Sequence, residues 1–485
     1  MKPVIKIAVL LFVLIIMESS CRKKFFDLEP FDALPIESAT QTEADLDVAA
    51  NGMYASLRDV DLYGRTLPLK GDLASDNVYL KTSNSGRYLT FRDFNQTTAN
   101  AEANNVWDAA YAAIKNANLI INAEIEQTEL VDQLKGEALT VRALMHFELV
   151  RNYASTFTVN PNALGVPIVT EFNQNALPSR NTVQEVYDQI ISDLKAAFAL
   201  MTLNQGESLV VSTTNKVRTV TSENVSKFTA EALLAKVYLT MGSWQLARDA
   251  ALDVVNNSGF TLVTAAAFQA YWANPAGRVD QVETMFEISS DAAANLSSDQ
   301  LSFFYDPAGY GDALITNDLI SQYSPSDVRL EVINTDSLSG ALVFINNKYS
   351  NSENPADKDD SKVLRFADVV LILAEASAQL NNTAVALSNL NRVAQTRDPL
   401  FGGFSSTGAQ LISDIINERR KELAFEGDRY WDLMRLNLPI TNHIKNQNPF
   451  TPFPIAVTDI HRLFPIPQNE IDVNPNIAGQ QNPGF

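Results

Sequence analysis

The chain has 485 residues, of which 46% are hydrophobic and 19% are charged, which argues for a globular protein with a large core and against a disordered or fibrous one. Acidic residues outnumber basic residues by 57 to 37, and the formal net charge of -20 argues against nucleic acid as a partner. A single cysteine excludes an internal disulfide, so stability has to come from packing.

The first twenty residues differ from the rest. A short basic start precedes an apolar run over residues 7–17, which is too short to cross a bilayer as a permanent helix. The following residues, MESSCRKK, resemble the lipobox of bacterial lipoproteins, in which the cysteine carries a diacylglycerol and becomes the new N-terminus, although Glu18 stands where leucine is usual. We predict a signal peptide over 1–20 and lipidation at Cys21; the alternative is an ordinary signal peptide with an incidental thiol.

The mature chain divides into a tether and one body. Residues 21–41 mix basic, proline and polar residues and are interpreted as the lipidated N-terminus and tether, whereas 42–485 form a single body. Within the body, hydrophobic residues recur at intervals of three and four in several long segments, as on the buried face of an amphipathic helix. The helices predicted in this way span residues 42–59, 101–125, 130–153 and 182–201.

Two later segments have the pattern of paired antiparallel helices. Residues 225–259 contain two helical stretches joined at Gly242, with alanines along the line where the helices meet, and 363–396 contain a similar pair. This pattern is typical of tetratricopeptide-type hairpins. Because the pairs do not follow each other at the repeat period, we predict a mainly α-helical scaffold of such hairpins, interrupted by long irregular loop insertions and with few strands.

The insertions lie near 60–100 and 264–362. The first is a shorter irregular segment. The second is rich in Asn, Ser, Asp, Gly and aromatic residues, and segments of its length in a compact protein are commonly functional or disordered. Aromatic residues argue for order in the longer one. These are Phe268, Tyr271, Trp272, Phe303, Phe304, Tyr305 and Tyr310.

No catalytic constellation can be recognised. None of the three histidines, His146, His443 and His461, has the spacing of a metal site, and no phosphate-binding loop or nucleophile elbow is present. The run DKDDSK at 357–362 lacks the oxygen spacing of a calcium loop and is interpreted as a solvated acidic turn. The sequence thus predicts no metal and no cofactor, while its many carboxylates leave a glycosidase-like acid pair open.

A charged segment near the C-terminus, NERRKELAFEGDRYWDLMRL (417–436), predicts two helices joined at Gly427, with Asp428 placed to cap the second. Its dense alternation of Arg with Glu and Asp predicts an ion network that fastens the C-terminal helices to the body.

The same segment closely resembles the signature of the SusD/RagB family of outer-membrane nutrient-binding lipoproteins. Further segments resemble the family in the same order along the chain, so the resemblance covers essentially the whole mature protein. They are GEALTVRALMHFELVRNYA (136–154), LGVPIV (164–169), the helical stretches beginning at VSKFTAEALL (225) and VLRFADVVLI (363), and the terminal LFPIPQNEIDVNPNIAGQQNPGF (463–485).

The resemblance implies a lipoprotein that is anchored in the outer membrane and faces the cell exterior. Such a protein sits as a lid on a SusC-like TonB-dependent transporter and delivers a nutrient to it, typically an oligosaccharide, without catalysis. Three alternatives stay open: a RagB-like peptide-binding protein, a lipid-anchored glycan hydrolase, and a purely structural lid that touches no ligand.

Ligand contacts are expected in the two insertions. Aromatic rings stack on the apolar faces of sugars, while Asp, Asn and Arg bind hydroxyl groups. For each aromatic the alternative is ordinary loop packing, and Trp107, Trp244 and Trp431 are predicted to lie in the core because they fall on helical stripes. The candidate ligand-binding residues are Asp76, Asn77, Tyr79, Arg87 and Tyr88 in the first insertion and Trp272, Tyr305 and Tyr310 in the second.

Overall fold

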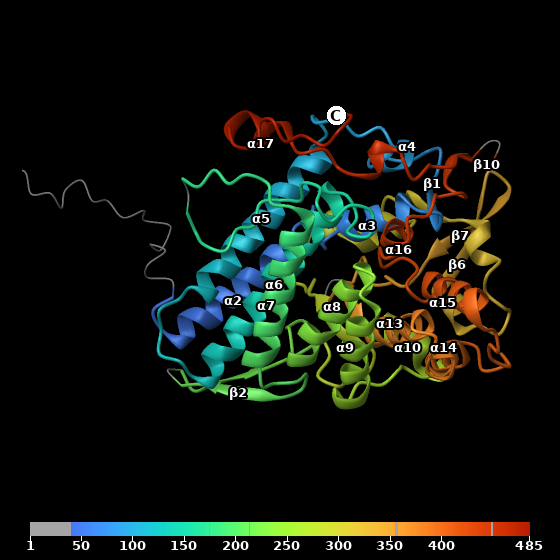
Figure 1. Ribbon diagram of the computed structural model, residues 1–485. Helices are drawn as coiled ribbons and strands as arrows, with labels where there is room; N and C mark the ends of the chain where they lie inside the picture. Colours follow the sequence, from blue (N-terminus) through green and yellow to red (C-terminus); the bar gives the residue numbers. More distant parts are fainter. Residues whose placement is uncertain (1–39, 174, 213, 355–356, 448–449) are drawn as a thin grey trace, which may run out of the picture.

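The computed structural model describes residues 40–485 except 174, 213, 355–356 and 448–449 (Figure 1). The predicted signal peptide over 1–20, the lipidation site Cys21 and nearly all of the predicted tether lie outside the described residues. None of the described helices is both long enough and apolar enough to cross a membrane.

The N-terminal half is a layer of long helices that lie side by side (Figure 1). Threonine is the N-cap residue of three of the four helices. At Thr182 the hydroxyl accepts from the Glu185 N–H, and the Glu185 carboxylate accepts from the Thr182 N–H. The third helix of the layer packs against both its neighbours and is buried along nearly its whole length. The four helices are α2 (Glu43–Leu57), α5 (Ala101–Ile121), α6 (Glu129–Tyr153) and α7 (Val183–Leu200).

Both predicted helical hairpins are present. The first pair turns at Gly242, whose φ of +70° favours glycine, and the second pair packs against the first although about a hundred residues separate them in sequence. One boundary was wrong: residues 363–365 belong to a strand, so the helix begins only at Phe366. The helices of this half are α8 (Lys227–Thr240), α9 (Trp244–Asn257), α13 (Phe366–Gln379), α14 (Thr383–Arg397), α15 (Gly408–Glu422) and α16 (Arg429–Arg435).

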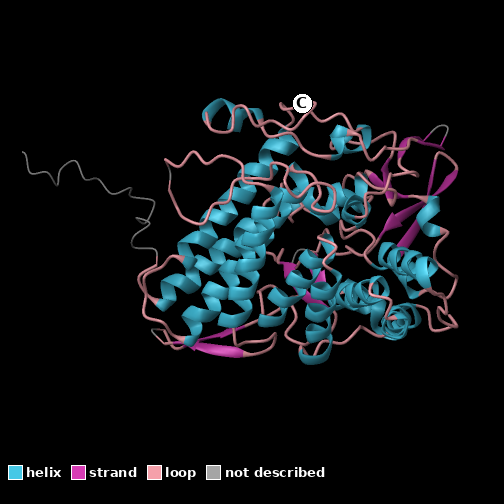
Figure 2. Cartoon of the chain, viewed as in Figure 1, coloured by secondary structure: helices cyan, strands magenta, loops and turns pink. Residues whose placement is uncertain are grey.

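The two insertions consist of short elements rather than structureless loops (Figure 2). The first contains α3 (Thr66–Leu73), β1 (Val78–Leu80) and α4 (Leu89–Asp93). The second contains η3 (Ala265–Ala267), α10 (Phe268–Ala273), β4 (Thr284–Ile288), η4 (Ser297–Asp299), α11 (Leu301–Tyr305), β5 (Ala313–Ile315), α12 (Asn317–Ile320), η5 (Val328–Val332), β6 (Ile333–Leu338), β7 (Ala341–Asn346) and the start of β8 (Ser361–Arg365). Elsewhere lie β2 (Ser208–Val211), β3 (Lys216–Thr219), β9 (Ile444–Gln447), β10 (Phe450–Pro452), η6 (Ile460–Arg462) and α17 (Gln468–Val473).

One sheet joins the two insertions. Its strand order is β1-β5-β7-β6, and β1 pairs antiparallel with β5, so that Leu80 lies opposite Ala313. Antiparallel pairing brings the residues that follow one strand beside the residues that precede its partner. Segment 81–88 therefore lies against segment 303–312, which positions the site described below.

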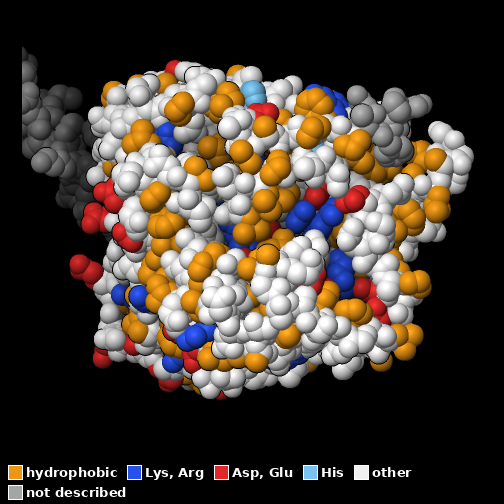
Figure 3. Space-filling model, turned by 45° about the vertical axis from the view of Figure 1, so that its right-hand side comes forward, with side chains coloured by type: hydrophobic (Ala, Val, Ile, Leu, Met, Phe, Trp, Pro, Cys, Tyr) orange, Lys and Arg blue, Asp and Glu red, His pale blue; other side chains and the backbone are white. Residues whose placement is uncertain are grey.

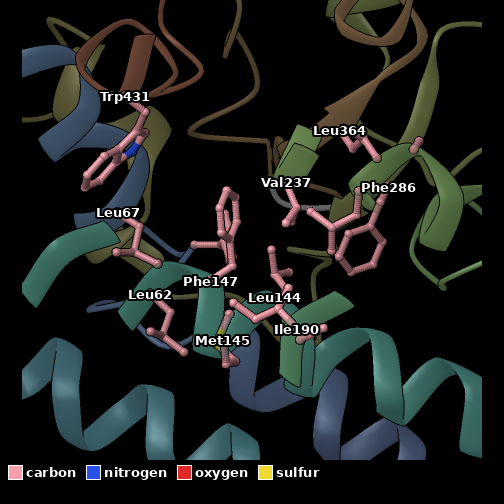
Figure 4. Close-up of a cluster of buried hydrophobic side chains, with 14 of the residues drawn as sticks. Leu62, Leu67, Leu144, Met145, Phe147, Ile190, Val237, Phe286, Leu364 and Trp431 are labelled. Carbon is pink, nitrogen blue, oxygen red and sulfur yellow. The ribbon is translucent and has the colours of Figure 1, made fainter. Parts of the chain in front are cut away.

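Buried hydrophobic side chains fill the space between α6 and the elements of the C-terminal half. Figure 4 shows Leu144 and Phe147 of α6 between the side chains of Leu67 and Trp431 on one side and of Phe286 on the other. A cavity of about 40 Å³ lies among these residues. It has room for a few water molecules at most, so it is not a sugar site.

His146 lies inside α6 with no exposed surface and is held in its neutral form. Its Nδ1 lies 3.0 Å from the Arg142 carbonyl oxygen, and its Nε2 lies 3.2 Å from the Val169 N–H, so these partners assign the proton to Nδ1. Burial lowers the pKa of His146 from 6.5 to about 4. Protonation would place a second N–H against the donor at Val169.

We expect this histidine to make the protein sensitive to mild acid. An unfolded chain binds the proton at a higher pH than the folded chain, so stability falls as pH drops from about 6.5 to about 4, by about 3 kcal/mol over that range. Urea unfolding at several pH values measures the free energy of unfolding as a function of pH. The slope between about pH 6.5 and 4 should be smaller in His146→Gln than in wild type, whatever the stability of the variant at neutral pH. His461→Gln, at a half-buried position, is the control, and equal slopes for both variants would contradict the prediction.

Candidate functional site

Segments 81–88 and 303–312 are held together by several hydrogen bonds. The Lys81 backbone N–H donates to the Asp312 carbonyl oxygen at 2.9 Å, and the Ser85 N–H donates to the Asp312 carboxylate at 3.1 Å. The Lys81 side chain reaches the Tyr310 carbonyl oxygen at 2.9 Å. These contacts fix the backbone on both sides of Tyr310.

Three partly exposed side chains meet where these segments touch. The Arg87 guanidinium lies over the Tyr310 ring, 4.2 Å from its centroid. The Phe303 ring stands edge-on to Tyr310, with centroids 5.6 Å apart and planes at 88°. We call Lys81, Arg87, Phe303 and Tyr310 the Arg87–Tyr310 cluster. It combines two rings, on which the apolar face of a sugar can stack, with two cations that can bind polar groups.

Buried neighbours position the cluster. Tyr88 has a φ of +58°, packs between Phe91 and Phe304, and accepts a hydrogen bond from Arg65 Nε at 2.7 Å. This anchor holds Arg87 beside the second segment. Gly309 is needed opposite Phe303, because a Cβ there would lie 2.3 Å from the Phe303 carbonyl oxygen.

Two polar groups of the cluster keep hydrogen-bonding capacity that no described residue uses. Among the described residues no acceptor bonds to the Arg87 guanidinium, and no partner bonds to the Tyr310 hydroxyl. The nearby carboxylates are occupied: Asp312 is buried and binds Ser85, and Asp306 accepts from the Ala308 N–H and from Ser352. The free groups can therefore bind a ligand.

Two predicted ligand residues belong instead to the interior. The Asp76 carboxylate accepts two hydrogen bonds from Arg429, at 2.8 and 2.9 Å, and the Asn77 side-chain oxygen accepts one from Arg420 at 2.9 Å. Burial alone would raise the pKa of Asp76, but Arg429 and Arg420 outweigh it and hold the pKa below its usual value. Both residues fasten α15 and α16 to the first insertion.

Four predicted aromatics are also buried, with exposed fractions between 1% and 6%. Tyr79 packs in a small cluster under the sheet, and Tyr88 is the anchor described above. Trp272 packs against neighbouring rings beneath the Lys348 ammonium group at 4.5 Å. Tyr305 donates to the Asp72 carboxylate at 3.1 Å. Of the eight predicted residues, the structure brings only Arg87 and Tyr310 together at the surface.

Sequence reasoning did not select Lys81 or Phe303. No periodicity distinguishes them, because they reach the cluster only through the pairing of β1 with β5. The one available signal was the run LSFFY in α11, where Phe304 and Tyr305 face inward and Phe303 remains partly exposed. Of the tryptophans predicted to be core residues, Trp107 and Trp431 are buried, and Trp244 is half-buried.

Two larger hollows lie elsewhere on the surface. One, of about 430 Å³, is lined by Arg278 and by small and aliphatic residues around Tyr271, whose hydroxyl bonds to Thr284. The other, of about 270 Å³, has the Phe401 and Phe404 rings at its edge, and its Asp398 carboxylate binds two serine hydroxyls. Figure 3 shows basic and acidic side chains adjoining one another on one face of the molecule. In the lining of the second hollow, Lys421 pairs with Glu418.

The predicted ion network of 417–436 is present and buried. Glu422 accepts from Arg329, Arg365 and Arg397, at 3.1, 2.9 and 3.0 Å. Asp428 stands at the N-cap of α16, but its side chain does not cap the helix; instead it pairs with Lys236 at 2.6 Å. Among the described residues no group of three His, Cys, Asp or Glu side chains could hold a metal ion.

Comparison with known proteins identifies the family. A family described as "Starch-binding associating with outer membrane" matches residues 24–239, and the SusD family matches residues 322–485. The chain belongs to the SusD/RagB family. The resemblance seen in the sequence is thereby confirmed, and the two matches leave out much of the second insertion, where the chain has no recognisable signature.

Relatives of this SusD/RagB chain align over nearly its full length. SusD-like protein P2 of Formosa agariphila is 28% identical over 95% of this chain and 96% of its own. A putative sugar binding protein from Bacteroides vulgatus has a similar structure, with a TM-score of 0.80, 28% identity, and coverage of 92% of this chain and all of that one. A SusD superfamily protein from Bacteroides thetaiotaomicron gives a TM-score of 0.79 at 26% identity, covering 91% of this chain and 100% of its own. These matches confirm the predicted mainly α-helical fold.

Proposed function

We propose that this protein binds an oligosaccharide at the Arg87–Tyr310 cluster and passes it to a SusC-like TonB-dependent transporter. The observation that carries the proposal is the pair of partly exposed rings beside an arginine whose donors have no acceptor among the described residues. The solved structure from Bacteroides vulgatus, described as a putative sugar binding protein, supports the choice of a sugar. Sugars present apolar faces to rings and hydroxyl groups to polar side chains, and the cluster offers both contacts.

The same proposal places the protein on the outer membrane, facing the cell exterior. Lipidation of Cys21 would supply the anchor, and the stretch before it has the features of a lipoprotein signal peptide. The matching family is described as associating with the outer membrane, which supports this location. Cys21→Ser should release the protein from membranes, whereas retention would contradict the lipid anchor.

An oligosaccharide fits the cluster better than a peptide does. Peptides commonly bind by adding a strand to a sheet edge or by filling an apolar groove. The rings and donors of the cluster lie in the short helix α11 and in neighbouring loops instead, where flat stacking is the available contact. We also propose no catalysis, because both carboxylates of segment 303–312, Asp306 and Asp312, already accept hydrogen bonds from the protein.

Calorimetric titration of the mature protein with panels of oligosaccharides and of peptides tests the ligand class. Tyr310→Ala should weaken oligosaccharide binding by about tenfold or more, because a stacking ring is lost. Phe401→Ala, a half-buried ring at the other hollow, should leave binding unchanged. Weakening by Phe401→Ala alone would move the site there, and binding of peptides alone would favour the RagB-like alternative.

Two further alternatives can be tested in the same way. New reducing ends after incubation with glycans would indicate a hydrolase. A purely structural lid predicts no binding and no effect of Tyr310→Ala on uptake. Trp272 and Tyr305 cannot serve in that test, because both are buried and their truncation would disturb packing.

A further inference from the structure

Arg87 differs from nearly all other arginines of the described chain. The others donate hydrogen bonds to carboxylates, side-chain oxygens or backbone carbonyls, except Arg392, which lies over the Phe366 ring at 5.1 Å. Arg87 is held by the Tyr310 ring and by its neighbour Tyr88, and its donors have no protein acceptor among the described residues. The guanidinium is thus oriented before any ligand arrives.

Arg87 is the accessible charged group of the cluster, because the charged groups around it already have partners. The Lys81 ammonium is tied to the Tyr310 carbonyl oxygen and lies 4.0 Å from the Asp312 carboxylate. Asp312 is buried, and Asp306 binds Ser352 and the Ala308 N–H. The acidic charge of the whole chain acts weakly here, because salt screens it beyond about 8 Å at physiological ionic strength. A ligand at the cluster therefore meets a free cation.

We propose that the oligosaccharide taken by this protein is acidic, carrying a carboxylate or sulfate group that binds the Arg87 guanidinium while a neighbouring sugar ring packs on Phe303 or Tyr310. The inference rests on the proposed function. The planar guanidinium matches a carboxylate or sulfate with two parallel hydrogen bonds, and such charge-assisted bonds are about twice as strong as bonds to a neutral hydroxyl. Its fixed position on the ring lowers the entropy lost on binding.

Two matched pairs of probes test the proposal. The first is tetragalacturonate and its carboxyl-reduced form; the second is a sulfated galactan tetrasaccharide and its desulfated form. Calorimetry with the mature protein should give at least tenfold tighter binding for the acidic member of at least one pair, and the pair that responds identifies the anion. The preference should shrink as salt is raised.

Variants then locate the preference. Arg87→Gln should abolish it, and Arg87→Lys, which keeps the charge but not the planar fork, should restore only part of it. Arg392→Gln is the matched control, since it removes another ring-bound arginine, and it should leave the preference unchanged. Tyr310→Ala should weaken both members of a pair.

The outcomes separate the two proposals. Equal or tighter binding of the neutral members, with loss in Tyr310→Ala, would overturn the acidic ligand and keep the oligosaccharide site. An acidic preference that survives Arg87→Gln would also overturn the assignment to Arg87. Binding of neither member of either pair, together with silence across the wider sugar panel, would overturn both.

Discussion

Glu422→Gln is expected to lower the free energy of unfolding by about 3–5 kcal/mol, the cost of removing one partner from a buried ion pair. The Glu422 carboxylate has almost no exposed surface and bonds three buried arginines. The neutral amide keeps the shape but leaves excess positive charge in the interior. Because Arg329, Arg365 and Arg397 come from η5, β8 and α14, their loosening should weaken the packing of these elements against α15.

Urea unfolding followed by circular dichroism at neutral pH measures this loss. Glu126→Gln is the control, because Glu126 is exposed between α5 and α6, and its change should stay within about 0.5 kcal/mol. A loss of less than about 1 kcal/mol in Glu422→Gln would mean that the arginines find other partners or water.

The difference in unfolding free energy between wild type and Glu422→Gln depends on pH with a definite sign. Burial alone would raise the pKa of Glu422, but Arg397, Arg365 and Arg329 outweigh it and hold the pKa well below the usual 4.5. The charge therefore contributes stability above about pH 4.5, and that contribution is lost as pH falls through the lower folded value. The unfolding free energies of wild type and Glu422→Gln should therefore converge at acid pH.

Helices were predictable because their signal is local. The stripe over 130–153 predicts α6 within a residue at its start, and Gly242 marks the turn between α8 and α9. The boundary at 363–365 was missed because these residues pair with β4, some eighty positions earlier in the chain. A run of apolar residues before a helix looks the same whether it extends the helix or forms a strand.

The site was predictable only in part, because exposure depends on tertiary contacts. Tyr305 and Tyr310 are five residues apart in the same insertion, yet Tyr305 is buried against Asp72 while Tyr310 lies partly exposed under Arg87. Residue type cannot separate them. Asp76 also had the chemistry of a sugar ligand, but its partner is Arg429, from the segment that the sequence had already marked as an ion network.

That partnership links the network to the site. Asp76 and Asn77 directly precede β1, and β1 leads into segment 81–88, which carries Arg87. The segment that identifies the family thus also supports the strand from which the candidate site is built. It stabilises the platform, while segment 303–312, which carries Phe303 and Tyr310, lies outside both family matches.

Gly71→Ala is expected to destabilise the protein by about 3 kcal/mol or more, because two backbones touch at this point. A Cβ on Gly71 would lie 1.8 Å from the Gly427 carbonyl oxygen, and Gly427 itself has a φ of +83° and would meet the Pro68 backbone if it carried a Cβ. At the same contact the Phe425 N–H donates to the Asp72 carboxylate at 3.2 Å. Moving the two backbones apart to make room for a Cβ would therefore strain this hydrogen bond.

Gly52→Ala is the matched control for the same chemical change. Gly52 lies exposed within α2, a Cβ there meets nothing within 4 Å, and alanine should stabilise the helix by about 0.5–1 kcal/mol. Urea unfolding should therefore give opposite signs for the two variants, and equal signs would contradict the close approach. Because α3 leads through Asp76 and Asn77 into β1, soluble Gly71→Ala protein should also bind sugar more weakly than Gly52→Ala, although neither glycine lies in the Arg87–Tyr310 cluster.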